Sequence, residues 1–354
     1  MKVNAITKAI AAASVAVASL AQAGSVSTDG ADLILKTKGG LALATADKQY
    51  SVQLGGRIQY DYNHAEKNGV TDEDQFDTRR ARLYVKGTIQ DWSFKSQFNV
   101  DSGGAEDLYI RYNGFGKQAT VTAGRQKMPF GLEELTSSKD ISMLERSALT
   151  EAYAVGRADG LQLSGANRNF TYAVAAFDAG DKTPGRESIG ATARATFAPV
   201  TTDDSVVHVG ASYQDTEGGT SAYGLEAAAV FGALHGQVEF FEADNGTTGP
   251  DTDGYYVQVG YVITGEQRPY KGGKFKKIKP SGSNGAVEVV ARYEDGEGDF
   301  GDIELDATDA TAWGLGVNWY VNNAVRLGLN YTDGESEVST DEGEEIRARL
   351  QIAF

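Results

Sequence analysis

The sequence predicts an all-β fold, a transmembrane antiparallel β-barrel of sixteen strands. Three observations carry this prediction. Polar and apolar residues alternate along most of the chain, which is the period of a strand with two unlike faces. Glycine is frequent, at 43 residues, and proline is rare, at 6. Beyond the first 23 residues there is no apolar run of the length that a membrane helix needs, whereas barrel strands cross a bilayer without one.

The alternation is clearest in three segments. Val52, Leu54 and Ile58 alternate with Gln53 and Arg57. The same pattern follows Trp92 to Val100 and Val325 to Thr332, and the last strand ends on an aromatic residue, Phe354. A soluble β-sandwich would fill its inward face with bulky aliphatic residues, but here one face is aromatic and the other polar. The expected strands cover residues 50–63, 77–89, 91–101, 106–114, 118–126, 158–165, 169–178, 187–197, 205–213, 222–231, 234–242, 254–263, 285–294, 309–320, 323–332 and 345–354.

The connections between these strands alternate in length. Tight turns are expected at Gln90-Asp91, Gly232-Ala233 and Asn322-Asn323, and longer acidic loops at 64–76, 295–308 and 333–344. Short turns at one end and long loops at the other are typical of outer-membrane barrels.

Two further segments do not fit the alternation of strand and turn. Residues 127–157 are too long for a simple rim loop, and folding into the lumen would narrow a wide barrel. Residues 264–284 carry five lysines and belong, by strand order, to the short-turn end. We interpret the second segment as either a basic funnel or a solvated turn.

The N-terminus indicates export. Lys2 and Lys8 precede an apolar stretch that is too short to span a membrane, and Ala21-Gln22-Ala23 is a signal-peptidase motif. We therefore divide the chain into a signal peptide, 1–23, a short periplasmic segment, 24–49, and a transmembrane barrel, 50–354. The expected location is the outer membrane of a bacterium, in contact with lipid and lipopolysaccharide.

The composition excludes several classes of function. A formal net charge of -16 disfavours a nucleic-acid partner, because phosphate neutralisation needs an excess of basic residues. The chain has no cysteine, and its three histidines lie far apart in sequence, so we expect no metal centre and no cofactor. A barrel enzyme would need a positioned serine and histidine; no G-x-S-x-G motif occurs, and we expect no enzymatic activity.

Several motifs resemble, in order, those of the phosphate-selective porin O and P family. They are the runs at 77–83, 108–112, 130–139, 264–270 and 318–320, which begin with Asp77-Thr78-Arg79-Arg80. The resemblance implies a homotrimer of sixteen-stranded barrels with long segments folded into the lumen. It also implies arginines along the path and a central anion site. Matched position by position, this site would include Arg79 and Arg80, the loop Ser137-Ser138-Lys139, and Asp107 with Arg146.

The residues themselves also favour an anion path. Placing the polar face of each strand in the lumen gives more basic than acidic side chains there, although the whole chain is acidic. Arginine suits this task because its planar fork binds phosphate or carboxylate while staying charged. Strict alternation points Arg80 and Arg82 into the lumen and Arg79 toward lipid. Because Arg79 lies at the end of the strand, we leave its orientation open. The expected pore-lining and anion-binding residues are Arg57, Arg79, Arg80, Arg82, Asp107, Arg111, Ser137, Ser138, Lys139 and Arg146.

The predicted function is passive diffusion of small solutes, with a preference for anions such as phosphate. One alternative keeps the same fold but passes neutral or cationic solutes. It is favoured by Glu133, Glu134 and Asp140, which place three acids in the segment expected to narrow the pore. We expect Arg80, with Arg82 behind it and Ser138 and Lys139 on the infolded segment, to form the narrow point.

Overall fold

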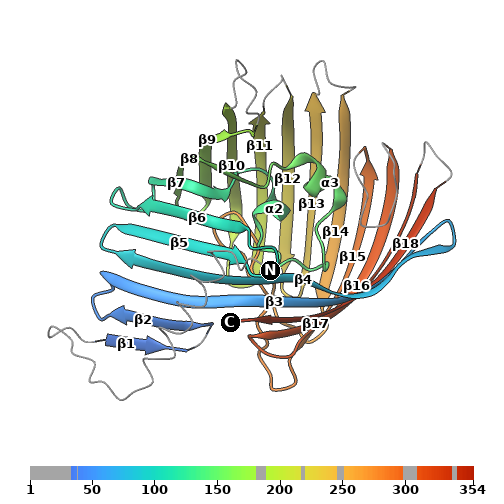
Figure 1. Ribbon diagram of the computed structural model, residues 1–354, viewed down its shortest axis with the longest axis horizontal. Helices are drawn as coiled ribbons and strands as arrows, with labels where there is room; N and C mark the ends of the chain where they lie inside the picture. Colours follow the sequence, from blue (N-terminus) through green and yellow to red (C-terminus); the bar gives the residue numbers. More distant parts are fainter. Residues whose placement is uncertain are drawn as a thin grey trace, which may run out of the picture.

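The protein folds into a closed antiparallel barrel (Figure 1). The computed structural model describes residues 33–37, 39–180, 189–216, 220–244, 251–297, 309–336 and 341–354. Each strand from β3 onward pairs with its neighbours in the sequence, and pairing of β18 with β3 closes the ring, in register from Gly343 opposite Lys67 to Ala353 opposite Arg57. The expectation of a sixteen-stranded barrel is confirmed by strands β3 to β18.

The observed strands follow the expected ones closely, and most are longer by a few residues. The barrel strands are β3 (Tyr50–Lys67), β4 (Val70–Ile89), β5 (Trp92–Asn99), β6 (Ala105–Tyr112), β7 (Thr120–Lys127), β8 (Arg157–Ala166), β9 (Phe170–Asp178), β10 (Ile189–Thr201), β11 (Ser205–Asp215), β12 (Ser221–Phe231), β13 (Leu234–Asp244), β14 (Thr252–Val262), β15 (Ala286–Gly296), β16 (Ala310–Tyr320), β17 (Val325–Ser336) and β18 (Glu342–Ala353).

A short hairpin precedes the barrel. Strands β1 (Leu33–Lys36) and β2 (Leu41–Thr45) pair with each other, and β2 continues onto the first residues of β3. Strand β3 is long enough to serve two partners, because its first part pairs with β2 and its remainder with β18. The signal peptide expected at 1–23 lies outside the described residues.

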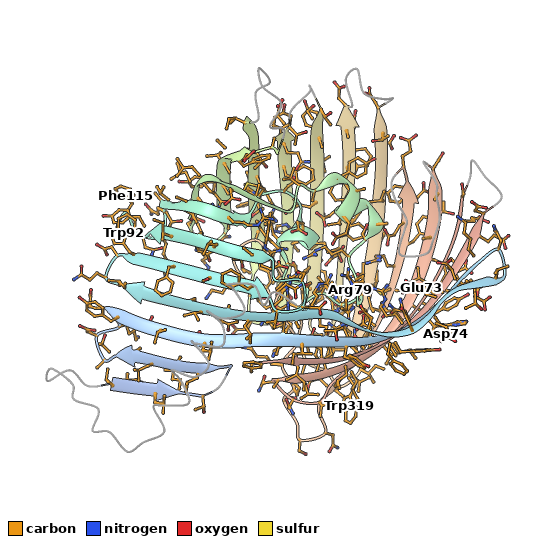
Figure 2. All side chains as sticks on the ribbon, viewed as in Figure 1. Glu73, Asp74, Arg79, Trp92, Phe115 and Trp319 are labelled. Carbon is orange, nitrogen blue, oxygen red and sulfur yellow. The ribbon has the colours of Figure 1, made fainter. Side chains whose placement is uncertain are left out.

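The alternation in the sequence becomes the two faces of the barrel wall. Large apolar residues such as Leu225, Leu315 and Ile352 are exposed on the outside, while the residues between them are buried in the lumen. Trp92 and Phe115 lie at one edge of the wall and Glu73 and Asp74 lie towards its opposite end (Figure 2). No helix among the described residues is long and apolar enough to cross a membrane.

The region expected as an acidic loop, 64–76, is instead part of a hairpin. Strands β3 and β4 continue until only Asn68 and Gly69 separate them. Both residues have positive φ, 53° and 72°, as the favoured two-residue hairpin turn requires. The acidic composition of 64–76 led to the expectation of a loop. Strands that extend beyond the lipid can carry charged side chains, because these side chains are in contact with water there. The tight turns expected at 90–91, 232–233 and 322–323 are present.

Two segments enter the barrel from its opposite ends. The first, residues 128–156, leaves β7 at the long-loop end and carries the short helices α2 (Leu132–Leu135) and α3 (Ala148–Tyr153), which lie within the ring in Figure 1. The second, residues 263–285, leaves β14 at the short-turn end and buries Arg268, Phe275 and Ile278. We call them the outer insert and the basic insert. Sixteen strands enclose more space than wall side chains can fill, so the inserts supply the packing.

The inserts are held by small apolar clusters inside the lumen. Phe130 and Tyr153 of the outer insert stack on Phe241 of β13, with ring centroids 5.9 and 5.5 Å apart. Leu132 of the outer insert and Phe275 of the basic insert share one cluster with wall residues. This contact joins the two inserts, so together they define the space left for solutes.

Candidate functional site

A water-accessible cavity of about 540 Å³ remains between the outer insert and the wall formed by β3 to β10. Its insert side includes Pro129, Leu135 and Ser137, and the tip of the basic insert closes one end with Gly272 and Lys274. Both inserts contact the remaining wall, from β11 to β18, where smaller cavities of about 350 and 40 Å³ lie.

The cavity lining is strongly basic. Among the described residues, Asp107 is the one acidic side chain in the lining. Tyr84 and Tyr109 lie between the cations, and Lys86, Lys95 and Arg111 approach their rings within 5.1–5.6 Å. The basic lining residues are Arg57, Arg82, Lys86, Lys95, Arg111, Lys117, Lys127, Lys139, Arg146, Arg157, Arg194 and Lys274.

Arg57 of β3 is a buried cation without a carboxylate partner within the described part of the chain. Its side chain is 6% exposed, and its Nη1 donates to Ser137 Oγ at 3.3 Å. Its Nε has no hydrogen-bond partner, and neither has the Nε of neighbouring Arg82. Both side chains line the cavity, where their positive charge attracts anions.

Next to Arg57, three cations share two acids. Glu106 binds Arg82 and, at 3.1 Å, Arg157 Nη1. Asp107 accepts from Arg157 Nε at 2.8 Å and also binds Lys95. The network links β4, β5, β6 and β8 and leaves an excess of positive charge facing the cavity.

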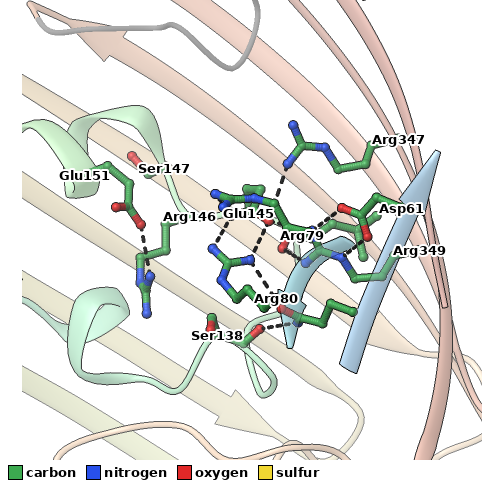
Figure 3. Close-up of polar contacts among 12 residues, drawn as sticks. Asp61, Arg79, Arg80, Ser138, Glu145, Arg146, Ser147, Glu151, Arg347 and Arg349 are labelled. Carbon is green, nitrogen blue, oxygen red and sulfur yellow. Dashed lines mark hydrogen bonds and ion pairs between the residues drawn. The ribbon is translucent and has the colours of Figure 1, made fainter. Parts of the chain in front are cut away.

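A second group of arginines lies away from the cavity, around Glu145 of the outer insert (Figure 3). Arg80 forms two hydrogen bonds to the Glu145 carboxylate, both of 2.7 Å, and Arg349 approaches the same carboxylate at 2.5 Å. Arg79 and Arg347 contact it at 3.1 and 3.4 Å. Burial alone would raise the pKa of Glu145, but these guanidiniums outweigh burial and hold its pKa well below the usual range.

Arg79 reaches this cluster because β4 contains a β-bulge. Gln59 of β3 pairs with Arg80 and Asp61 pairs with Asp77, so two residues of β4 oppose the single residue between them. The extra residue breaks strict alternation and lets neighbouring Arg79 and Arg80 both contact Glu145. The side chain of Arg79, whose orientation the sequence left open, therefore contacts Glu145 on the lumenal side and does not line the cavity.

The three acids that favoured a cationic or neutral path lie outside the cavity lining. Glu134 binds Lys127 at 2.8 Å and Arg146 at 3.0 Å; burial opposes its ionisation, but these two cations lower its pKa. Glu133 accepts from Ser147 N at 2.8 Å near the start of α3, and burial raises its pKa. Asp140 lies 3.9 Å from Lys139 Nζ.

The basic insert is anchored to the wall by two of the chain's three histidines. His208 lies 2.6 Å from the Tyr270 hydroxyl and 2.7 Å from Glu226. His235 lies 2.8 Å from Glu288 and 3.4 Å from Arg268. The segment expected as a funnel or solvated turn is therefore fixed inside the lumen, with Lys274 directed at the cavity.

The structure gathers most of the expected site residues around one space and separates two of them. Arg79 and Arg80 lie in the Glu145 cluster, outside the cavity lining, whereas Arg82, Ser138 and Lys139 of the expected narrow point line the cavity. Among the lining cations, sequence reasoning missed Lys117, Lys127 and Arg157, and only the position of the last two beside a long insertion pointed to them. Lys274 belongs to the basic segment that the sequence had marked as a funnel or a solvated turn. The expected residues that line the cavity are Arg57, Arg82, Asp107, Arg111, Ser137, Ser138, Lys139 and Arg146.

Comparison with known proteins gives one family and a common architecture. Residues 52–217 and 214–354 match the model of the family described as phosphate-selective porin O and P. Porin O of Pseudomonas aeruginosa is 33% identical over 432 aligned residues, covering 97% of this chain and 97% of that protein.

Solved structures share the fold at low sequence identity. An anion-selective porin from Comamonas acidovorans has a TM-score of 0.59 and 14% identity, over 86% of this chain and 100% of that chain. The trimer form of Vibrio cholerae OmpT has a TM-score of 0.55 and 15% identity, over 86% of this chain and 99% of that chain. At such identities, the likeness concerns the barrel fold alone.

Proposed function

The chain belongs to the phosphate-selective porin O and P family, and we propose that its lumen selects small anions for passive diffusion. It is an integral protein of the bacterial outer membrane. The observation that carries the proposed selectivity is the cavity lining, in which many cations face one acid, Asp107, among the described residues. Low-dielectric walls focus the field of such charges, so the lining outweighs the acidic net charge.

Inorganic phosphate is the anion that we propose as the preferred solute. The guanidiniums of Arg57 and Arg82 line the cavity, and Ser137 adds a hydroxyl beside Arg57. An oxyanion can accept several such donors at once, whereas chloride has no directional lone pairs to match a planar fork. Further cations on both sides, Arg111 and Lys139 among them, allow the ion to move on.

The arrangement of the outer insert supports the anionic path over a cationic one. Glu133 and Glu134, which could have cancelled the field, are engaged by Ser147 N and by Lys127 and Arg146. Their carboxylates serve to fix the insert against the wall. No chemical step is part of this proposal, and hydrolysis of lipids or peptides by the purified protein would contradict it.

Three further features of the mature protein belong to the proposal. The family resemblance supports a homotrimer, and the exposed apolar outer face supports contact with membrane lipid, including lipopolysaccharide. The A-x-A motif at 21–23 supports cleavage before Gly24, which would leave residues 24–49 as a periplasmic segment preceding the barrel. Native mass spectrometry in mild detergent measures both the assembly and the mature N-terminus.

The decisive experiment is ion selectivity in a planar bilayer. In a potassium chloride gradient, the reversal potential should have the sign of anion permeation, and added inorganic phosphate should reduce the chloride current by competing for the cavity. A reversal potential of the opposite sign would reject anion selectivity. Anion selectivity without any effect of phosphate would retain the channel and reject phosphate as its preferred solute.

A further inference from the structure

We propose that Glu106 is a specificity-determining residue, which weakens anion binding at the cavity so that bound solutes can leave. The inference rests on the proposed anion path and deepens it. Glu106 directly precedes Asp107, which lines the cavity. Strict alternation along the strand would point Glu106 toward lipid, so the sequence did not place it in the lumen.

A β-bulge brings Glu106 into the lumen. Gln97 of β5 pairs with Asp107 and Phe98 pairs with Ala105, which leaves Glu106 as the extra residue of β6. Leu108, on the other side of Asp107, is half exposed on the outer face, as alternation requires. Bulges re-aim side chains at functional sites, and this one places two carboxylates side by side on the lumenal face.

Glu106 is placed to neutralise the cations that would otherwise bind a solute most strongly. It binds Arg82 of β4 and Arg157 of β8, which approach it from opposite sides. Asp107 already serves Arg157 and Lys95. Without Glu106, Arg82 would stand beside Arg57 with no carboxylate in the described contacts, and the two would form an unbalanced pair of guanidiniums.

The charge balance matters because a pore must release what it binds. Binding has to be strong enough to draw the ion in and weak enough for it to leave. Arg57 makes no direct ion pair in the described contacts, and Glu106 neutralises part of the charge of its neighbour Arg82. The pair of bulged acids therefore sets the residence time of an anion, whereas the cations set the sign of selectivity.

A purely structural role predicts a different result. If Glu106 only held Arg82 and Arg157 in place, the amide of glutamine would loosen both, and phosphate would bind less well. If Glu106 instead weakens anion binding through its charge, the loss of that charge strengthens phosphate binding, even though the contacts with Arg82 and Arg157 become weaker. The direction of the change separates the two roles.

The test measures phosphate block of the chloride current through the full-length protein in planar bilayers. Glu106→Gln should lower the half-blocking concentration of inorganic phosphate at least about threefold, since removing a charge a few ångströms away changes binding by that much or more. It should also make the reversal potential more anion-selective. Glu345→Gln is the matched control, because it removes a lumenal acid paired with Arg347 outside the cavity lining.

An unchanged or raised half-blocking concentration in Glu106→Gln, with parental folding, would overturn the proposal. If that variant does not fold, the comparison of Arg157→Gln with Arg157→Gln/Glu106→Gln replaces it, and the double variant must bind phosphate more tightly. Equal binding in the two would again overturn the proposal. A parent channel that is cation-selective or insensitive to phosphate would instead reject the proposed function, before any variant is measured.

Discussion

Arginine serves different purposes on the two sides of the barrel. On the β3–β10 side, Arg57, Arg82 and Arg111 face a water-accessible cavity. On the β15–β18 side, Arg292 and Arg326 donate to backbone carbonyls of the outer insert, and Arg349 binds carboxylates. The outer insert makes the difference, because it brings its carbonyls and Glu145 to one side and leaves the other side to solvent.

This difference shows that the role of a lumenal arginine depends on whether the outer insert or the cavity lies against its side chain, and not on the strand that carries it. A buried ion pair contributes little net stability when complete, but removing one partner leaves an uncompensated buried charge. The covered side should therefore respond to mutation through stability. The open side should respond through ion selectivity, because its arginines line a water-accessible cavity.

The largest effect should follow the loss of Arg349. It is buried, binds Asp61 through two contacts of 2.5 and 2.7 Å, and also binds Glu145. Arg349→Ala would leave both acids short of a partner, and we expect a loss of about 3–5 kcal/mol in the free energy of unfolding. Urea unfolding of the detergent-solubilised barrel measures it. Arg111→Ala, on the open side, is the control and should cost much less; equal losses would contradict the distinction.

The next largest effect should come from neutralising the carboxylate that balances the covered side. Glu145→Gln leaves Arg80, Arg347 and Arg349 without their shared anion. The pKa of Glu145 is lower in the folded state than in the unfolded state, so its ionised form stabilises the fold at every pH above the ordinary pKa of a glutamate. This stabilisation is lost as the pH falls through the lower, folded-state pKa.

We therefore expect Glu145→Gln to be less stable than the parent at neutral pH, and the gap to narrow in strong acid. Unfolding midpoints compared at neutral pH and in strong acid give both quantities. A stability difference that grows on acidification would show that the ionised carboxylate is not what holds the insert.

A selectivity change without a stability change is expected at Arg57. Arg57→Gln removes the one cavity arginine that is buried and has no described carboxylate partner. The reversal potential should shift toward cations, and phosphate should block less well, while the free energy of unfolding stays within about 1 kcal/mol of the parent. Arg80→Gln is the inverse control, since it should lower stability and leave the reversal potential nearly unchanged. If Arg80→Gln shifts selectivity as much, the cavity does not define the ion path.

Sequence periodicity predicted the wall of this barrel, because each strand repeats its two faces independently of the others. It failed at 64–76, where acidic residues outside the lipid continue the strands. It failed again at Arg79 and Glu106, since a one-residue bulge reverses facing without any mark in the composition. Motif resemblance named several residues that line the cavity, among them Asp107, Ser137 and Lys139, but could not show which arginines the outer insert neutralises.

That last distinction depends on contacts between residues far apart in the sequence. Glu145 meets Arg349 and Arg80 across the lumen, and no local pattern around any of the three announces the pairing. The lysines of the basic insert were visible as a charge run, yet their place in the lumen depends on Phe275, Ile278 and the two anchoring histidines. The charge run alone slightly favoured a funnel over a solvated turn and could not show that the segment packs inside the lumen.

The smallest predicted effect concerns Lys274, the part of the basic insert that reaches the open side. Burial lowers its pKa, and the nearby cations Lys276, Arg194, Arg111 and Lys95 lower it further, to about 7. The amine is therefore charged below pH 7 and neutral above it. In potassium chloride, whose ions do not titrate, anion selectivity should be somewhat greater at pH 6 than at pH 8. The change is modest because Lys274 is one of many lining cations.

Lys274→Ala should remove this pH step, whereas Lys279→Ala, which alters an exposed lysine of the same insert outside the cavity lining, should keep it. A step that persists in Lys274→Ala would show that the charge of Lys274 has no part in the pH response of the open side.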